Sequence, residues 1–235
     1  MRKKSIHILG GGTVYHIRPQ FALCAPSFGQ TARKIAGLSQ LRWGPNYDVH
    51  LHLTRMACGG KSDLETNQDV EVFLKSLVND PDCHVIFMAM SLCEFQGHVI
   101  NGSTATDSGL KLPKLRGIDG RKLMVIDPVA DLIAEIRKYR KDLVLVGFST
   151  TSGSTDEDMF ASGISTLERY SCNIVFASDF NTKSGIIIQS NQWIGKDRVS
   201  KNRIALLQEL VQETHSISTS TTITEEMASA AAISL

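Results

Sequence analysis

The sequence predicts an α/β protein with a Rossmann-like three-layer fold, built on a mostly parallel sheet and extended by a long loop or arm and a C-terminal tail. Short apolar runs typical of strands alternate along the chain with segments whose apolar residues recur at helical spacing. Two runs, 84–90 and 143–148, are continuously apolar, as strands covered on both faces of a parallel sheet are. The 235 residues are enough for one large core, so we expect a single domain over 1–215 and a low-complexity tail over 216–235.

The first part of the chain is predicted to supply three strands and two helices. Residues 5–9 form a short strand that leads into a glycine turn, and residues 47–55 alternate apolar and polar side chains as a half-buried strand does. The buried strand 84–90 is the third. Between these strands, the segments 31–41 and 68–78 place their apolar residues on one helical face.

The middle of the chain is predicted to hold a mobile loop. Residues 96–120 are rich in Gly, Ser and Thr and poor in apolar residues, and a connection of this length is usually functional. A strand over 122–126 follows it. We expect the next helix to span 127–140, with Asp127 as its cap and Pro128 at its first position.

The remaining elements continue the alternation. Strands are expected at 143–148 and 172–178, with a helix over 156–171 between them. The segment 184–195 suggests a late hairpin, and residues 200–216 show the period of a long amphipathic helix. In a parallel sheet of this kind, ligands bind at the carboxyl ends of the strands.

Composition argues against several classes of protein. The formal net charge is +1, with 25 basic and 24 acidic residues, so no basic nucleic-acid-binding surface is expected. No stretch approaches the roughly 18 apolar residues of a membrane span, and the basic start of the chain reaches glycine too soon for a signal peptide. The five cysteines are scattered without a CxxC motif. We therefore expect a cytoplasmic protein with reduced thiols, no structural zinc, and neither a nucleic-acid nor a membrane partner.

Three consecutive glycines, Gly10 to Gly12, followed by Thr13, stand at the end of the first strand. Glycine allows a positive φ and a close approach of the backbone to an anion such as a nucleotide phosphate. Neither the dinucleotide fingerprint nor a Walker loop is complete, because Tyr15 stands where the former needs Gly or Ala. A tight strand-to-helix turn is the alternative explanation of these glycines.

A second phosphate site is expected at 25–34. Ser27, Gly29 and Thr31 precede a helix there, and the free N–H groups and dipole of a helix N-terminus suit an anion. Helix capping alone would explain the same residues.

Charged side chains near the expected carboxyl edge of the sheet suggest further roles. Lys111 and Lys114 lie around Pro113 in the predicted mobile loop, where they could close over a polyphosphate and exclude water. A solvated run of charge is the alternative. Glu94, just after the strand 84–90, either holds Mg²⁺ or caps a turn.

Six short motifs, which lie between Gly11 and Asp179, have the order and spacing of a known family, and the resemblance runs over roughly residues 5–213. They are GGTVYHIRP, APSFGQTA, AMSLCEF, KLPK, LVGFSTT and NIVFASD. Together they resemble the phosphopantothenate–cysteine ligase (phosphopantothenoylcysteine synthetase) family of coenzyme A biosynthesis. The resemblance implies a Rossmann-like domain that forms a homodimer through an extension between strands, with the substrate pocket completed across the dimer.

The resemblance also implies a reaction. CTP or ATP, with Mg²⁺, would activate the carboxylate of a 4'-phosphopantothenate-like acid as an acyl-nucleotidylate, which a cysteine-like amine then attacks. Carried over residue by residue, the nucleotide-binding positions are Gly11, Gly12, Thr13, Ser27, Gly29, Phe148 and Ser178. Lys111 and Lys114 become the catalytic lysines, and Glu94 becomes the Mg²⁺ ligand.

The chain also departs from the family pattern. Ala25 stands where the family has the asparagine that stabilises the intermediate, and Phe21 and Phe28 replace an arginine and a serine. Glu94, Thr151 and Ser178 replace an aspartate, a glutamate and an asparagine. Two alternatives therefore remain: a catalytically degenerate nucleotide-binding or assembly protein of the same fold, and a nicotinamide-dependent reductase. The incomplete glycine fingerprint, and the lack of an acidic residue at the end of the second strand, argue against the reductase.

Overall fold

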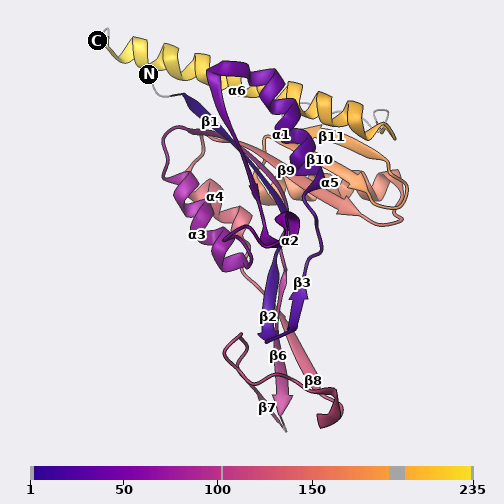
Figure 1. The fold of residues 1–235 in the computed structure, drawn as a ribbon. Helices are drawn as coiled ribbons and strands as arrows, with labels where there is room; N and C mark the ends of the chain where they lie inside the picture. The colour runs from indigo at the N-terminus through magenta and orange to yellow at the C-terminus, as the bar shows by residue number, and fades with distance from the viewer. Residues whose placement is uncertain (1–2, 102, 191–198, 234–235) are drawn as a thin grey trace.

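The computed structural model describes residues 3–101, 103–190 and 199–233, which form three layers around a central sheet (Figure 1). The sheet has six strands in the order β11-β10-β9-β5-β1-β4. All neighbours in it are parallel except β11, which is antiparallel to β10. The strands are β1 (Lys4–Gly12), β4 (Tyr47–Leu53), β5 (Cys83–Ser91), β9 (Val144–Thr151), β10 (Ile174–Asp179) and β11 (Gly185–Gln189). The predicted Rossmann-like α/β fold with a mostly parallel sheet is confirmed.

Two layers of helices cover the faces of this sheet (Figure 1). One face carries α1 (Gln30–Trp43) and α6 (Arg203–Ile233), and the other carries α3 (Asn67–Val78), α4 (Leu132–Tyr139) and α5 (Asp156–Tyr170). A short α2 (Arg55–Cys58) follows β4, and Gly44–Asn46 and Gly117–Asp119 form single 3-10 turns.

Each face of the sheet has its own apolar core, because side chains alternate along a strand. Ile6 and Ile8 of β1 pack in one cluster with Ile35 of α1 and Leu210 of α6. Leu9, which points the opposite way, belongs to the cluster under α3, α4 and α5. The helical period predicted for 31–41 and 68–78 is confirmed by α1 and α3.

An antiparallel arm extends from the carboxyl edge of the central sheet (Figure 1). It contains the hairpin β2 (Val14–Arg18) and β3 (Phe21–Cys24), and a small sheet in the order β7-β6-β8. Its strands are β6 (Phe95–Asn101), β7 (Thr104–Ala105) and β8 (Leu123–Pro128). The expectation of a loop over 96–120 is therefore wrong for its first part, which pairs as β6, and the predicted strand 122–126 pairs with β6 instead of joining the central sheet.

Two further expectations differ from the structure. The helix predicted from Asp127 begins at Leu132, because Pro128 pairs with Phe95 at the end of β8 and Asp131 supplies the cap by accepting the N–H of Ile133. The late hairpin is made by β10 and β11, and its predicted second half falls in 191–198, outside the described residues.

The predicted tail 216–235 shows no break at its first residue. α6 continues through it to Ile233, and the side chain of Ser218 is fully buried. The backbone oxygen of Ser218 lies 3.1 Å from Nε2 of His84 at the start of β5. The helix therefore remains packed on the sheet beyond residue 215.

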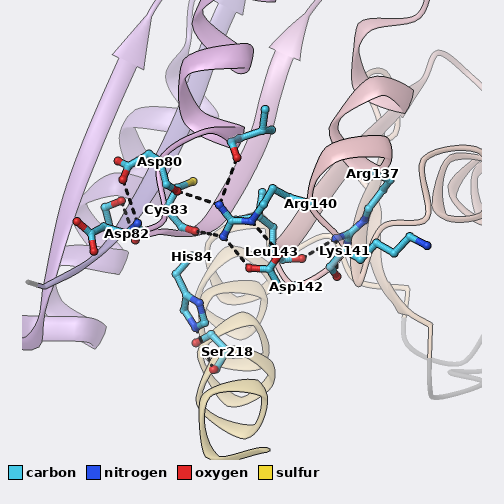
Figure 2. A network of polar contacts seen from close by, with 12 residues as sticks. Asp80, Asp82, Cys83, His84, Arg137, Arg140, Lys141, Asp142, Leu143 and Ser218 are labelled. Carbon is cyan, nitrogen blue, oxygen red and sulfur yellow. Dashed lines mark hydrogen bonds and ion pairs between the residues drawn. The ribbon is translucent and has the colours of Figure 1, made fainter. Parts of the chain in front are cut away.

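Two arginines of the α4 end hold the amino edge of the sheet together (Figure 2). Arg140 donates to the backbone oxygens of Asp80 and Cys83 and forms a bidentate pair with Asp142. Arg137 donates to the backbone oxygen of Leu143 at 2.7 Å. These guanidinium groups donate to backbone carbonyls at, or just before, the starts of β5 and β9. This network lies at the amino edge, opposite the carboxyl edge at which sheets of this kind bind ligands. We therefore assign it a role in stabilising the fold.

Candidate functional site

A cavity of about 610 Å³ opens at the carboxyl edge of the central sheet. β5 and β9 pair only from Val85 to Phe87 and from Val144 to Val146, although the two strands run on to Ser91 and Thr151. Because the strands part beyond this point, the cavity lies between their ends and is lined by residues of both helix layers. We call it the fork cavity.

Four of the predicted site residues line the fork cavity: Ser27, Glu94, Phe148 and Ser178. They come from the segment before α1 and from the ends of β5, β9 and β10. The ring of Phe148 lies 6.0 Å from the ring of Phe176, which gives the cavity an aromatic wall. An aromatic wall beside several hydroxyl groups can accommodate a planar base and its sugar or phosphate oxygens.

The predicted glycines lie beside this cavity but do not line it. They are part of β1, where Gly10 to Gly12 pair with Ala89 to Ser91, so the expected glycine turn is wrong. A Cβ on Gly11 would lie 2.1 Å from Oγ1 of Thr54, and a Cβ on Gly12 would lie 1.9 Å from the backbone oxygen of Ala25. Close packing against the protein's own side chains and backbone therefore explains these glycines, and their role in nucleotide binding stays a prediction.

Gly29 has a similar packing reason. It is the residue before α1, its φ is 69°, and a Cβ there would lie 2.8 Å from a methyl carbon of Leu53. A residue with a side chain would be strained at this φ and would also collide. No side chain caps the N-terminus of α1 as a result.

Thr13 is a structural bridge between three segments. Its fully buried hydroxyl donates to Oδ1 of Asn67 at 2.6 Å and accepts the N–H of Cys93 at 2.7 Å. The amide of Asn67 in turn donates to the backbone oxygen of Cys93 at 2.8 Å. The single hydroxyl hydrogen is already donated to Asn67, so a hydrogen bond donated by Thr13 to a nucleotide phosphate would have to break that bond.

Lys111 lines a second cavity, also of about 610 Å³, between the arm and the start of α3. We call it the arm cavity. Lys114 is exposed and lines neither cavity. Three residues line both: Asn67, Cys93 and Val129. The two cavities therefore adjoin, and Lys111 lies in the space next to the fork cavity instead of inside it.

The described residues offer few ligands for a metal ion. Within them, no group of three or more His, Cys, Asp or Glu side chains could hold one. Glu94 is exposed at the fork cavity. Asp179, at the end of β10, is buried and accepts hydrogen bonds from the backbone of Thr182 and Ser154 and from the hydroxyl of Thr151, which hold its pKa below the usual range. A Mg²⁺ ion in the fork cavity would take most of its ligands from phosphate and water, as Mg²⁺ in proteins commonly does.

The wall of the fork cavity under α4 and α5 carries a charged group that sequence patterns missed. Arg169 and Asp131 form an ion pair of 2.8 Å, and both line the cavity with Tyr170. Burial, and then the nearby Asp131, raises the pKa of Tyr170 to about 12. This wall therefore presents a cation, a carboxylate and a neutral phenol to a ligand.

Arg203, the first residue of α6, also lines the fork cavity and was not expected to be functional. A signal for it exists in the sequence: a cation in the first turn of a helix opposes the helix dipole, so such a placement needs another reason. The amphipathic period of residues 200–216 predicted the helix, but it did not mark Arg203 as a site residue.

Solved structures share this fold at low sequence identity. A DNA/pantothenate metabolism flavoprotein from Streptococcus pneumoniae is 16% identical, with a TM-score of 0.69 over 90% of this chain and 99% of that one. The C-terminal domain of the coenzyme A biosynthesis bifunctional protein CoaBC is 13% identical, with a TM-score of 0.58 over 96% and 98%. A Cab2 mutant in complex with phosphopantothenate-cysteine is 12% identical, with a TM-score of 0.69 over 95% and 89%.

No protein-family model and no curated protein sequence matches this chain. At 12–16% identity, the similarity to the solved structures shows the fold alone. The chain therefore has the fold of these solved structures, which is the Rossmann-like fold that the sequence predicted.

Proposed function

We propose that this protein is a nucleoside-triphosphate-dependent ligase that joins a 4'-phosphopantothenate-like acid to a cysteine-like amine. The observation that carries the proposal is the pair of adjoining cavities at the carboxyl edge. One contains Phe148, Ser178, Ser27 and Glu94, and the other contains Lys111. Two cavities that share a wall can hold a nucleotide and an acid side by side, which the activation of the acid by the nucleotide requires.

The fork cavity would hold CTP or ATP. Its aromatic wall at Phe148 and Phe176 suits the base, and Ser27 and Thr31, near the start of α1, suit the phosphates. Glu94 and the nucleotide would share the coordination of Mg²⁺, which supplies charge neutralisation when bound. On the opposite wall, Asp131 and Arg169 offer opposite charges to the ammonium and carboxylate groups of an amino-acid-like amine.

The arm cavity would hold the acid. Its wall combines apolar side chains such as Leu110 and Leu112 with the polar Asn67 and Gln68. The acid's carboxylate would attack the α-phosphorus of the nucleotide and displace pyrophosphate. Lys111 would then face the charge that develops on the phosphates, and the arm would exclude water from the acyl-nucleotidylate.

Replacing Lys111 by alanine is expected to lower pyrophosphate release by about 10²–10³-fold, as the loss of one charge-stabilising donor does. The assay supplies CTP or ATP, Mg²⁺, 4'-phosphopantothenate and cysteine to the whole chain. The matched control is Lys61→Ala, an exposed lysine that lines neither cavity and should leave the rate unchanged. Rapid release that is unaffected by Lys111→Ala would contradict the proposal.

The catalytically degenerate alternative rests on Ala25. This residue lies in a shallow pocket that adjoins the fork cavity at Glu94, and it has no side-chain donor for the intermediate. We therefore expect slow ligation by the parent and faster ligation by Ala25→Asn. If both release no pyrophosphate while nucleotide still raises the melting temperature, the non-catalytic binding module is the better description.

We also propose that the protein is a homodimer formed through the arm. β8 is an edge strand, and its side chains Leu123, Met124, Val125 and Ile126 are 37–59% exposed. An exposed apolar edge strand favours pairing with another chain. Light scattering at micromolar concentration should give twice the 25.8 kDa of one chain. Val125→Glu should give the monomer mass, whereas Ile118→Glu, at an 86% exposed residue of the 3-10 turn Gly117–Asp119, should leave the dimer mass unchanged.

A further inference from the structure

Arg203 is a half-buried cation whose charge has no described counterpart. Its Nη2 donates to Oγ1 of Thr31 at 2.9 Å, and its guanidinium lies 5.2 Å from the centre of the Phe176 ring. Burial lowers the pKa of Arg203. No acidic residue of the described segments forms an ion pair with it. A partly desolvated charge without a carboxylate carries a cost in the empty protein, which an anionic ligand would offset.

The surroundings of Arg203 favour an anion as that partner. It reaches the fork cavity beside Ser27, Thr31 and Ser178, whose hydroxyl groups can donate hydrogen bonds. The bond to Thr31 fixes the guanidinium next to the first turn of α1, a helix end that has no acidic residue and no side-chain cap. Both features make the potential at this end of the cavity positive.

The other charged side chains that line the fork cavity belong to elements or segments other than α6. Arg169 is already neutralised by Asp131. Glu94 lies after the end of β5, whereas Arg203 stacks on a side chain of β10. Among the described residues that line the fork cavity, Arg203 is therefore the cation whose charge no carboxylate of the protein offsets.

We propose that Arg203, Thr31 and Ser27 form an anion subsite that binds a phosphate group of the ligand in the fork cavity. This inference deepens the proposed function and relies on it only for the identity of that ligand, a nucleoside triphosphate. The guanidinium would make charge-assisted hydrogen bonds to phosphate oxygens, and its stacking on Phe176 would hold it in place before the ligand arrives. Arg203 is thus assigned as a binding residue, and no proton or bond change is attributed to it.

The test measures binding of inorganic pyrophosphate, CTP and ATP by calorimetry, in EDTA, with the parent chain and Arg203→Met. We expect the dissociation constants for pyrophosphate and both triphosphates to rise about tenfold or more in the variant, since hydrogen bonds to a charged group are lost. Cytidine and adenosine, which lack phosphate, should bind both proteins alike. Arg203→Lys should fall between them, and Arg33→Met, on an exposed arginine of the first turn of α1, should bind as the parent does.

A second readout separates binding from a structural role. Because an uncompensated buried charge is removed, Arg203→Met without ligand should melt at the parent's temperature or above it. A lower melting temperature together with unchanged pyrophosphate affinity would overturn the subsite, and so would a parent that binds no pyrophosphate at millimolar concentration. Pyrophosphate binding that depends on Arg203 in a protein that never ligates acid to amine would uphold the subsite and reject only the ligase.

Discussion

Gly11→Ala is expected to destabilise the ligand-free protein by about 3 kcal/mol, the sum of a strained backbone and an overpacked contact. The φ of Gly11 is 105°, which disfavours any residue with a side chain. Its Cβ would also lie 2.1 Å from Oγ1 of Thr54 and 2.8 Å from the Cβ of Ala57. The variant must therefore push β1 away from the segment that follows β4, and the measurement is urea unfolding of the empty protein.

Gly37→Ala is the matched control for this prediction. Gly37 lies within α1, and nothing lies within 4 Å of the place its Cβ would occupy. Alanine is the better helix former, so this variant should equal the parent or be more stable by up to about 1 kcal/mol. If Gly11→Ala were as stable as the parent and only lost affinity for nucleotide, the glycines would be a phosphate cradle, as the sequence first indicated, and the packing explanation would be wrong.

Elements with a strong local signal could be predicted from the sequence. The continuous apolar run of β5 and the helical period of α3 are properties of neighbouring residues, and both elements lie where they were expected. The strands of the arm could not be predicted from local sequence in this way. β6 is recognisable only once it pairs with β8, more than twenty residues further along, and that same pairing retains Pro128 in a strand. Pairing over such a distance leaves no mark in the local composition.

The candidate site also contains residues that local sequence predicts and residues that it does not. Phe148 and Ser178 end predicted strands, and Glu94 lies shortly after the predicted strand 84–90, so their meeting at the carboxyl edge follows from parallel pairing. The cavity itself depends on where β5 and β9 cease to pair, which no motif encodes. Arg203 and Ser27 are 176 positions apart and share a cavity because α6 packs beside α1. Tertiary contacts of this kind determine the charge of the site.

A cluster of three histidines should make the stability of this protein fall steeply in mild acid. The ring of His7 in β1 stacks on both His50 and His52 of β4, with ring centres 5.0 and 5.2 Å away, and its Nδ1 lies 3.0 Å from Nε2 of His52. Burial, and then the neighbouring imidazoles, lowers the pKa of His7 to about 4, against a weaker opposing effect of Asp80. Burial, followed by His50, lowers the pKa of His52 to about 4 as well. The alternation of 47–55 marked His50 and His52 only as the polar face of a strand.

A histidine whose pKa is lower in the folded protein binds fewer protons there than in the unfolded chain. The stability it contributes is complete above the unfolded value of 6.5 and is lost as the pH falls toward about 4. Between pH 7 and pH 5 we expect the free energy of unfolding to drop by about 2 to 4 kcal/mol for the pair, the upper figure applying if the two titrate independently. Urea unfolding at both pH values measures this drop. The double variant with His7→Gln and His52→Gln should lose most of it, whereas His98→Gln, in the arm, should keep it. An equal drop in the double variant would mean that acid destabilises the protein through other groups.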